Sequence, residues 1–361
     1  MNKFLLLQKI RSVHPIKMAN IVVYKIAYAF YMAIEKRILK KNKGFKYLIH
    51  CLKPNLNTQA FGSFNVYYDL CYLDQSVLSV ADAIVENKIE LFDSIYTIEE
   101  TDWLKDPISA KSWDANVFFT DAKVEKKGYG DVKYVMELNK MGFLVNLAQA
   151  YYITSDEKYI RKILQYLKGW IQTVSHFKSV VHKSMLDVSF RCINLIHIAL
   201  LSYQSDLFNK EVLPLIHAIL VYSEKQIRKF STPRWCKYST GANHTIGEMA
   251  GLLVTQFFLS LLTNAKYTQY YKKQFFYLNR SLKNIITDKG VYLEQSAHYT
   301  KLVTEFLVVL DIFIKTIKNT EANRYYTDIY LKQLLQYISI LSYNNKLPNF
   351  GDNDGAKVLL P

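Results

Sequence analysis

The arrangement of apolar residues after residue 130 constrains the fold of this 361-residue chain more than any other feature. Apolar side chains recur there at the three- and four-residue spacing of an α-helix, and short joints rich in Ser, Thr, Asn, Asp and Gly interrupt the pattern. We predict helices over 131–152, 156–173, 185–204, 208–229, 243–263, 266–286, 297–317 and 322–343. Since short joints place successive helices side by side, these stretches predict four helical hairpins and an all-α fold.

The stretch 243–263 is apolar on more than one side. Ile246, Met249 and Leu253 lie on one stripe of the expected helix, and Leu252 and Phe258 widen that stripe well beyond a single face. A helix of this kind must be covered on two sides. This pattern is typical of an inner helix in an arrangement of two helical layers, so we expect an α/α repeat architecture.

The first 130 residues are less regular. Residues 17–40 show the pattern of another helix, and residues 53–130 predict loops with short helices. No low-complexity linker divides the chain. We therefore expect one domain over 61–361, preceded by a basic helical extension over 1–60.

The net charge of +15 is concentrated in that extension. Residues 1–60 contain twelve Lys or Arg and a single acid, Glu35, so they account for eleven of the fifteen charges. A basic helix suits an anionic lipid surface or another polyanion, and we expect peripheral membrane contact through residues 17–46. A solvated basic helix without a partner is the alternative. No nucleic-acid partner is expected.

Cysteine usage and the N-terminus bear on the compartment. The four cysteines, at positions 51, 71, 192 and 236, form no paired or metal-binding spacing, which predicts reduced residues and no metal site. The apolar run in MNKFLLLQKIRSV is too short for a signal peptide, and no uninterrupted apolar run is long enough to predict a membrane span. Cytoplasm, at the inner face of the membrane, is the expected location, with the periplasm as the alternative.

Several segments together resemble a known family. They read DVKYVMELNKMGFLVNLAQAYYITSDEKY (131–159), DVSFRCINL (187–195), NHTIGEMAGLL (243–253), EQSAHYTKL (294–302) and FGDNDGAK (350–357). Their order and spacing resemble the α-helical domain of heparinase II/III-like polysaccharide lyases over about 131–357. The Glu-Leu-Asn, Asn-His and Glu-x-Ser-x-x-Tyr elements in combination are fairly specific to that family.

The resemblance implies an incomplete (α/α) toroid followed by a C-terminal β-sandwich, with the Gly-Asp-x-Asp element at the join. Pro361 follows Lys357 by four residues, so we expect the sandwich to be absent from this chain. One catalytic His of the family belongs to the sandwich. Lyase activity is therefore expected if the natural protein includes that domain.

The chemistry of such a lyase explains the residues that the resemblance assigns. β-Elimination at a uronic acid needs neutralisation of the carboxylate, a base for the C5 proton and an acid for the leaving O4. Asn243, with the backbone N–H groups of a helix N-terminus, suits the first need. His244 and Tyr299 suit proton transfer, and Glu248 lies one turn after His244 and is placed to orient it. The resemblance implies catalytic roles for Asn243, His244 and Tyr299.

Each of these residues also has a structural interpretation. Asn243 alone is a good helix N-cap. His244 and Glu248 alone are a solvent-exposed pair on one helix face. Tyr299 alone is one of 28 tyrosines and is expected in the core.

Further substrate contacts are assigned with alternatives. Arg191 is expected to clamp a carboxylate through two hydrogen bonds, or else to form a buried salt bridge with a carboxylate such as Asp187. Arg234 and Trp235 precede Asn243, where a sugar would stack on the indole, or else the indole anchors the loop. Glu137 and Asn139 are expected to support the site from behind. Asp352 and Asp354 are expected in a turn, because no bidentate acid follows at the spacing of a calcium loop.

Three functions remain in competition at this stage. The first is a polysaccharide lyase-like protein that acts on a uronate-containing surface or capsular polysaccharide, without a cofactor. The second is a non-catalytic polysaccharide-binding or assembly protein at the inner membrane face. The third is a helical scaffold for protein partners, which has no need of Asn243, His244 and Tyr299 in combination.

Overall fold

The computed structural model describes residue 33 and residues 56–64, 75–174, 177–231, 243–263, 265–318, 320–344, 346–353, 355 and 358–359. The predicted helix at 17–40 therefore lies outside the described residues except for Ala33. Arg234 and Trp235 lie outside them as well.

The described residues form two layers of helices. The inner layer consists of α5 (Ser76–Val85), α7 (Gly142–Thr154), α9 (Met185–Ser202), α12 (Asn243–Thr263), α14 (Ala297–Ile317) and α16 (Ile329–Leu341). The outer layer consists of α8 (Glu157–Thr173), α10 (Leu213–Phe230), α13 (Thr268–Ile285) and the short α15 (Thr320–Asn323). Short segments complete the fold: η1 (Gln59–Ser63), α6 (Val132–Leu138), η2 (Val180–His182) and the π-helical turn η3 (Phe208–Val212).

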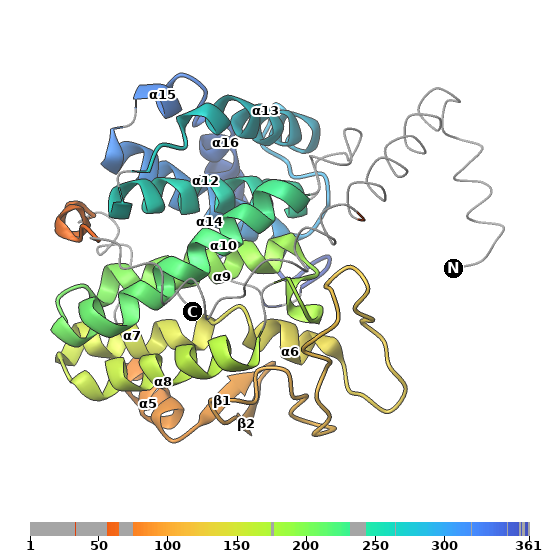
Figure 1. Cartoon of the computed structure of the whole chain (residues 1–361). Helices are drawn as coiled ribbons and strands as arrows, with labels where there is room; N and C mark the ends of the chain where they lie inside the picture. The colour runs from red at the N-terminus through yellow and green to blue at the C-terminus, as the bar shows by residue number, and fades with distance from the viewer. Residues whose placement is uncertain are drawn as a thin grey trace.

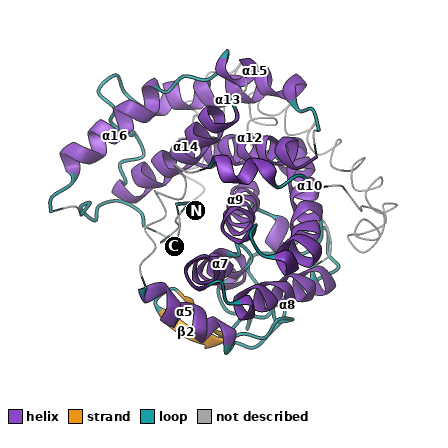
Figure 2. Cartoon of the chain, turned by 90° about the vertical axis from the view of Figure 1, so that its left-hand side faces the viewer, coloured by secondary structure: helices purple, strands orange, loops and turns teal. Residues whose placement is uncertain are grey.

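Successive inner helices pack against one another and form an open arc. Contacts run from α5 to α7, α9, α12, α14 and α16, while α8, α10 and α13 cover α7, α9 and α12 from outside. Figure 2 views this arc along several of its helices, with α5 at one end and α16 at the other. Figure 1 shows the same layers from the side. This architecture confirms the predicted all-α, incomplete (α/α) toroid.

The helix predictions agree with the structure apart from two divided stretches. The stretch 131–152 separates into α6 and α7, because Met141 between them has a left-handed backbone with φ of 64°. The stretch 322–343 separates into α15 and α16. Both breaks depend on loop packing, which apolar periodicity does not report.

One small sheet was not anticipated by the sequence analysis. Strand β1 (Lys88–Leu91) pairs antiparallel with β2 (Ser94–Thr97), with Leu91 opposite Ser94. Phe92 and Asp93 both have positive φ, 50° and 60°, as a tight two-residue hairpin turn requires. Because Phe is unusual in such a turn, residue type gave little indication of the hairpin.

Helix α12 occupies the middle of the arc and is buried on both sides, as its apolar pattern predicted. It packs between α9 and α14. Gly247 and Gly251 allow the close approach: a Cβ at Gly251 would lie 2.6 Å from the Cβ of Ser189, and one at Gly247 would lie 2.4 Å from Leu186. Two small residues one turn apart therefore set the distance between α12 and α9.

Two of the described helices, α9 and α12, are long and apolar enough to cross a membrane by length and composition. In the structure, 94% of that stretch in α9 and 89% of it in α12 are buried inside the molecule. Both helices serve as core helices of the arc.

The inner helices α7, α9, α12 and α14 run in the same direction, because an outer helix or a connecting segment returns the chain after each one. Their N-terminal ends consequently gather at one edge of the arc. We call this edge the N-terminal rim and define it as residues 137–142, 182–187, 243–244 and 294–299. The predicted site residues Asn243, His244 and Tyr299 all lie on it.

Candidate active site

Asn243 and Glu294 connect two inner helices at the N-terminal rim. The backbone N–H of Asn243, at the start of α12, donates to Oε1 of Glu294 at 3.2 Å. Glu294 also accepts a hydrogen bond from the hydroxyl of Tyr292, with 2.7 Å between the oxygens. Glu294 begins the quoted Glu-x-Ser-x-x-Tyr element, but the sequence analysis assigned it no role. The carboxylate of Glu294 therefore occupies a backbone N–H at the start of α12 that we expected to be free for a ligand.

The side chain of Asn243 does not cap α12. It is 8% exposed, and its buried Oδ1 has no hydrogen-bond partner among the described residues. An N-cap would accept from a backbone N–H two or three residues further on. A buried amide oxygen without a partner is costly, by about 1–3 kcal/mol, so its position needs another explanation than local helix stability.

Tyr299 lies in the first turn of α14 and is half-buried. Ser296 caps this helix, since its Oγ accepts the backbone N–H of Tyr299 at 3.0 Å. Tyr299 is close to the Tyr292–Glu294 pair: burial first, then Glu294, then the charge of Tyr299 raise the pKa of Tyr292. Glu294 therefore bonds the start of α12 from the loop that leads into α14, and Tyr299 lies in the first turn of α14.

The C-terminal segment reaches the same place. The hydroxyl of Ser296 donates to the backbone oxygen of Asp352 at 2.6 Å, and the backbone N–H of Ala297 donates to the oxygen of Phe350. Gly351 between them has φ of 74°, and a Cβ there would lie 2.4 Å from the backbone oxygen of Gln295. Residues 350–352, at the start of the Gly-Asp-x-Asp element, therefore pack against the start of α14; Asp354 lies outside the described residues.

His244 and Glu248 differ in environment although they lie one turn apart on α12. The imidazole of His244 is exposed at the rim, whereas Glu248 is 2% exposed. The buried carboxylate does not face solvent, so the interpretation of a solvent-exposed pair does not describe Glu248. A direct substrate contact for Glu248 is not favoured by this burial; its expected orienting role towards His244 stays a prediction.

Arg191 is fully buried and binds backbone rather than facing the rim. Its Nε donates to the oxygen of Asn139 at 2.7 Å, and its Nη2 donates to the oxygen of Val181 at 2.9 Å. The guanidinium lies over the Trp170 ring, and burial lowers the pKa of Arg191 to about 10. This environment corresponds neither to a substrate clamp nor to the alternative, an ion pair with Asp187. The expectation of a substrate contact is not supported by the structure.

Asn139 connects the same region from its other side. Its Nδ2 donates to the backbone oxygens of Trp103 and Val135, and its Oδ1 accepts the indole N–H of Trp170 at 2.9 Å. Arg191 and Asn139 together join α6, α8, α9 and η2. This position agrees with the supporting role expected for Asn139.

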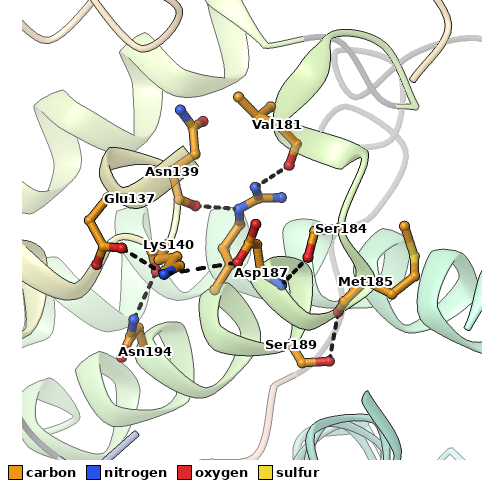
Figure 3. Close-up of polar contacts among 10 residues, drawn as sticks. Glu137, Asn139, Lys140, Val181, Ser184, Met185, Asp187, Ser189 and Asn194 are labelled. Carbon is orange, nitrogen blue, oxygen red and sulfur yellow. Dashed lines mark hydrogen bonds and ion pairs between the residues drawn. The ribbon is translucent and has the colours of Figure 1, made fainter. Parts of the chain in front are cut away.

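Lys140 forms a charged cluster that the sequence analysis did not identify (Figure 3). Its Nζ lies 2.6 Å from Glu137 and 3.9 Å from Asp187, at the N-terminal ends of α7 and α9. The side-chain amide of Asn194 donates to the backbone oxygen of Lys140 at 2.8 Å. Asp187 thus lies beside Lys140, a cation that sequence spacing did not connect with it.

The described residues contain no group of three or more His, Cys, Asp or Glu that would hold a metal ion. Cys192 is buried and unpaired, and burial raises the pKa of its thiol to about 11. The other three cysteines lie outside the described residues.

The rim gathers the groups that acid–base chemistry on a sugar requires. A half-buried phenol, an exposed imidazole and a buried amide whose oxygen has no partner among the described residues lie on this rim. They come from two segments about fifty residues apart in the chain, and Glu294 holds those segments together.

An open arc of helical hairpins with polar groups at one rim defines an (α/α)-toroid protein. The chain belongs to the heparinase II/III family: its sequence matches the Heparinase II/III N-terminus over residues 44–359. No curated protein matches it.

Solved structures of similar fold carry related descriptions. A heparinase III crystal structure is 18% identical with a TM-score of 0.50, and the match covers 85% of this chain and 49% of that one. The heparan sulfate lyase HepC from Pedobacter heparinus is 16% identical with a TM-score of 0.50, covering 78% of this chain and 40% of that one. The chain thus spans less than half the length of these lyases, and the likeness establishes the fold.

Proposed function

We propose that this chain forms the helical part of a polysaccharide lyase that cleaves a uronate-containing acidic polysaccharide by β-elimination. The observation that carries the proposal is the hydrogen bond from Asn243 to Glu294, which joins the start of α12 to the segment that leads into the first turn of α14, where Tyr299 lies. Membership of the heparinase II/III family supports it, because the related structures are described as lyases of this class.

In the proposed reaction, the amide of Asn243 donates a hydrogen bond to the uronate carboxylate and makes the C5 proton more acidic. A base, Tyr299 or His244, accepts that proton. The electron pair forms a C4–C5 double bond while the C4–O4 bond breaks, and an acid delivers a proton to O4. A single phenol on one face of the sugar serves both transfers if the elimination is syn.

Glu294 constrains this scheme. Its carboxylate accepts a hydrogen bond from a backbone donor of α12 and from the hydroxyl of Tyr292, so it adds negative charge where an anionic substrate must bind. Glu294 is therefore assigned a positioning role. It holds the start of α12 against the loop that leads into α14.

A link to surface or capsular polysaccharide, and peripheral membrane contact through residues 17–46, belong to the same proposal. The support for membrane contact is the concentration of eleven net positive charges in the first sixty residues. The expected location at the inner face of the membrane follows from that contact.

A second candidate is a non-catalytic polysaccharide-binding or assembly protein. One observation favours it: the carboxylate of Glu294 occupies one α12 backbone donor that a substrate carboxylate would otherwise use. In that case the rim binds the acidic sugar and no bond is cleaved.

Substitution of Tyr299 tests the proposal. The full-length natural protein is incubated with uronate polymers, and the ultraviolet absorbance of unsaturated ends is followed. Tyr299→Phe removes one hydroxyl and keeps the ring, so we expect turnover to fall by about 10²-fold or more with little change in stability. Tyr330→Phe, on half-buried Tyr330 of α16, is the matched control and is expected to keep full activity.

Two outcomes decide between the candidates. Near-normal turnover by the Tyr299→Phe protein would overturn the mechanism proposed here. If the unsubstituted protein binds a polymer but produces no unsaturated ends from it, the binding function takes its place.

A further inference from the structure

Helix α13 differs in charge from the other helices that the structure describes. It carries Lys272, Lys273, Arg280 and Lys283 and contains no Asp or Glu. These four charges equal the whole excess of residues 61–361, which contain 34 basic and 30 acidic residues. A strongly basic helix in an otherwise balanced body points to an anionic partner.

The cations of α13 are not neutralised by neighbours. Elsewhere on the surface several lysines are paired with an acid: Lys210 with Asp206, Lys315 with Asp311 and Lys332 with Asp328. Within the described part of the chain, no acid lies within ion-pair distance of Lys272, Lys273, Arg280 or Lys283. Their positive charges are available to a ligand from solvent.

These cations occupy one stripe. At 100° per residue, Gln269 and the four basic residues lie within an arc of about 100° on the helix surface. The buried residues Tyr271, Gln274, Phe275, Leu278 and Leu282 lie on the opposite side and face the protein. Figures 1 and 2 show α13 at the outer edge of the molecule, away from the concave side of the arc.

A large apolar side chain lies in the middle of the basic stripe. Phe276 is 58% exposed, and its ring is 5.7 Å from that of the half-buried Tyr277. An exposed Phe among unpaired Lys and Arg is typical of helices that lie in a lipid interface, where the ring enters the acyl boundary and the cations contact headgroups. A hydrated polyanion would satisfy the cations but offers no apolar medium for the ring.

We propose that the outward stripe of α13, defined by Gln269, Lys272, Lys273, Phe276, Arg280 and Lys283, is a docking surface for an anionic phospholipid membrane. The partner is identified by charge complementarity and by the exposed Phe. The stripe faces outward and contains no residue of the N-terminal rim. The docking proposal does not depend on the lyase proposal.

Vesicle co-sedimentation of the full chain tests the proposal. The vesicles contain phosphatidylglycerol and phosphatidylcholine, or phosphatidylcholine alone. The α13 variant carries Lys272→Gln, Lys273→Gln and Lys283→Gln. The matched control carries Lys210→Gln, Lys315→Gln and Lys332→Gln, which remove the same number of exposed charges elsewhere.

The basic N-terminal segment must be separated from α13. Both triple variants are therefore also made in a chain with Lys36→Gln, Arg37→Gln, Lys40→Gln and Lys41→Gln. In both backgrounds we expect the α13 variant to bind anionic vesicles at least about tenfold more weakly, because each cation near such a surface contributes to the affinity. We expect the affinity of the control variant to change less than about twofold. At high salt, where the charges are screened, we expect the remaining binding to anionic vesicles to be weaker for Phe276→Ser than for the unsubstituted chain.

Three results would overturn the proposal. In the first, the α13 variant binds anionic vesicles as tightly as the unsubstituted chain. In the second, the two triple variants lose the same affinity, which would show that binding depends on the net charge of the protein and not on α13. Alternatively, the α13 variant would lose affinity for a soluble polyuronate while keeping its affinity for vesicles, and the stripe would then be a polysaccharide surface.

Discussion

At the scale of the residue, side chains of the same chemical type play different parts according to what surrounds them. Arg191 and Lys140 are both cations behind or on the N-terminal rim. Arg191 is wholly buried against two backbone oxygens, whereas Lys140 retains some exposure between Glu137 and Asp187. A buried guanidinium bound to backbone stabilises the arrangement of loops and does not recognise a ligand in this state.

Arg191→Met therefore tests a structural role. The substitution keeps bulk but leaves the oxygens of Asn139 and Val181 without their donor. We expect the free energy of unfolding to fall by roughly 3 kcal/mol or more, because two hydrogen bonds to a charged donor are lost. Denaturant unfolding measures this loss. Arg324→Met, on an exposed residue paired with Glu321, is the control and is expected to change stability by less than about 0.5 kcal/mol.

The opposite outcome is equally informative. If Arg191→Met leaves the unfolding midpoint unchanged but abolishes polysaccharide binding, Arg191 contacts the ligand after a rearrangement, and the clamp expected from sequence is correct.

At the scale of the element, α12 determines how closely the arc can pack. Its apolar pattern requires cover on two sides, and α9 and α14 provide it. Gly247 and Gly251 lie where those neighbours approach, so the helix backbone comes near to Leu186 and Ser189. Glycine lowers intrinsic helix stability, and here the close approach of α9 offsets that cost.

Gly251→Ala is expected to destabilise the protein, although the same change raises the stability of an exposed helix. The new Cβ would lie 2.6 Å from the Cβ of Ser189, which has no rotamer that moves it away. Overpacking of this kind costs about 1–3 kcal/mol. Thermal and denaturant unfolding measure it. At Gly62 the nearest atom is 3.9 Å away, so Gly62→Ala is the control and is expected to be neutral; a stabilised Gly251→Ala protein would contradict the packing described here.

At the scale of the whole molecule, the end of the described chain is held across two inner helices. The backbone oxygen of Val358 lies 2.9 Å from Nε2 of His197 on α9, and its N–H donates to Glu305 on α14 at 2.8 Å. Both side chains are buried. A segment far away in sequence thereby ties the middle of the arc together, with the imidazole as neutral donor.

This connection predicts a stability that depends on pH. Burial lowers the pKa of His197 from 6.5 to about 4, so the folded protein holds the imidazole neutral. The unfolded chain takes up a proton as the pH falls below 6.5, and the folded chain does so only near 4. Stability is full above pH 6.5 and falls towards pH 4, by up to roughly 3 kcal/mol.

The free energy of unfolding is measured between pH 7 and pH 4.5 for the unsubstituted protein and for His197→Gln, which keeps a donor for Val358. We expect a shallower decline in the variant. His217→Gln tests the same argument at a second place: burial also lowers the pKa of His217 on α10, so this variant is expected to flatten the decline as well. If His197→Gln and the unsubstituted protein decline in parallel, His197 is not the group responsible.

The sequence predicted helices far better than it predicted side-chain environments. The stretches at 156–173, 243–263 and 297–317 agree closely with α8, α12 and α14, because helical periodicity is a local property of the chain. The breaks at Met141 and at 324–328, and the hairpin at Phe92 and Asp93, were missed. They depend on backbone conformations that neighbouring loops impose and that these residue types do not signal.

The candidate site shows the same division. The resemblance assigned catalytic roles to Asn243, His244 and Tyr299, and in the structure the first two begin α12 and the third lies in the first turn of α14, all on the N-terminal rim. Glu294 was part of a quoted motif, yet its contact with Asn243 spans 51 residues and leaves no spacing signal.

What the sequence by itself determined is the order of the helices, their all-α arrangement and the central place of α12, since each follows from apolar periodicity and short joints. Only the tertiary structure decided which polar groups face the rim and which are buried. In the folded protein Arg191 is buried, and Glu294 accepts a hydrogen bond from a backbone donor of α12. The cations of α13 have no acid within ion-pair distance among the described residues. The physical reason is that burial and charge pairing depend on neighbours distant in the chain, and a one-dimensional pattern contains no information about their distance in space.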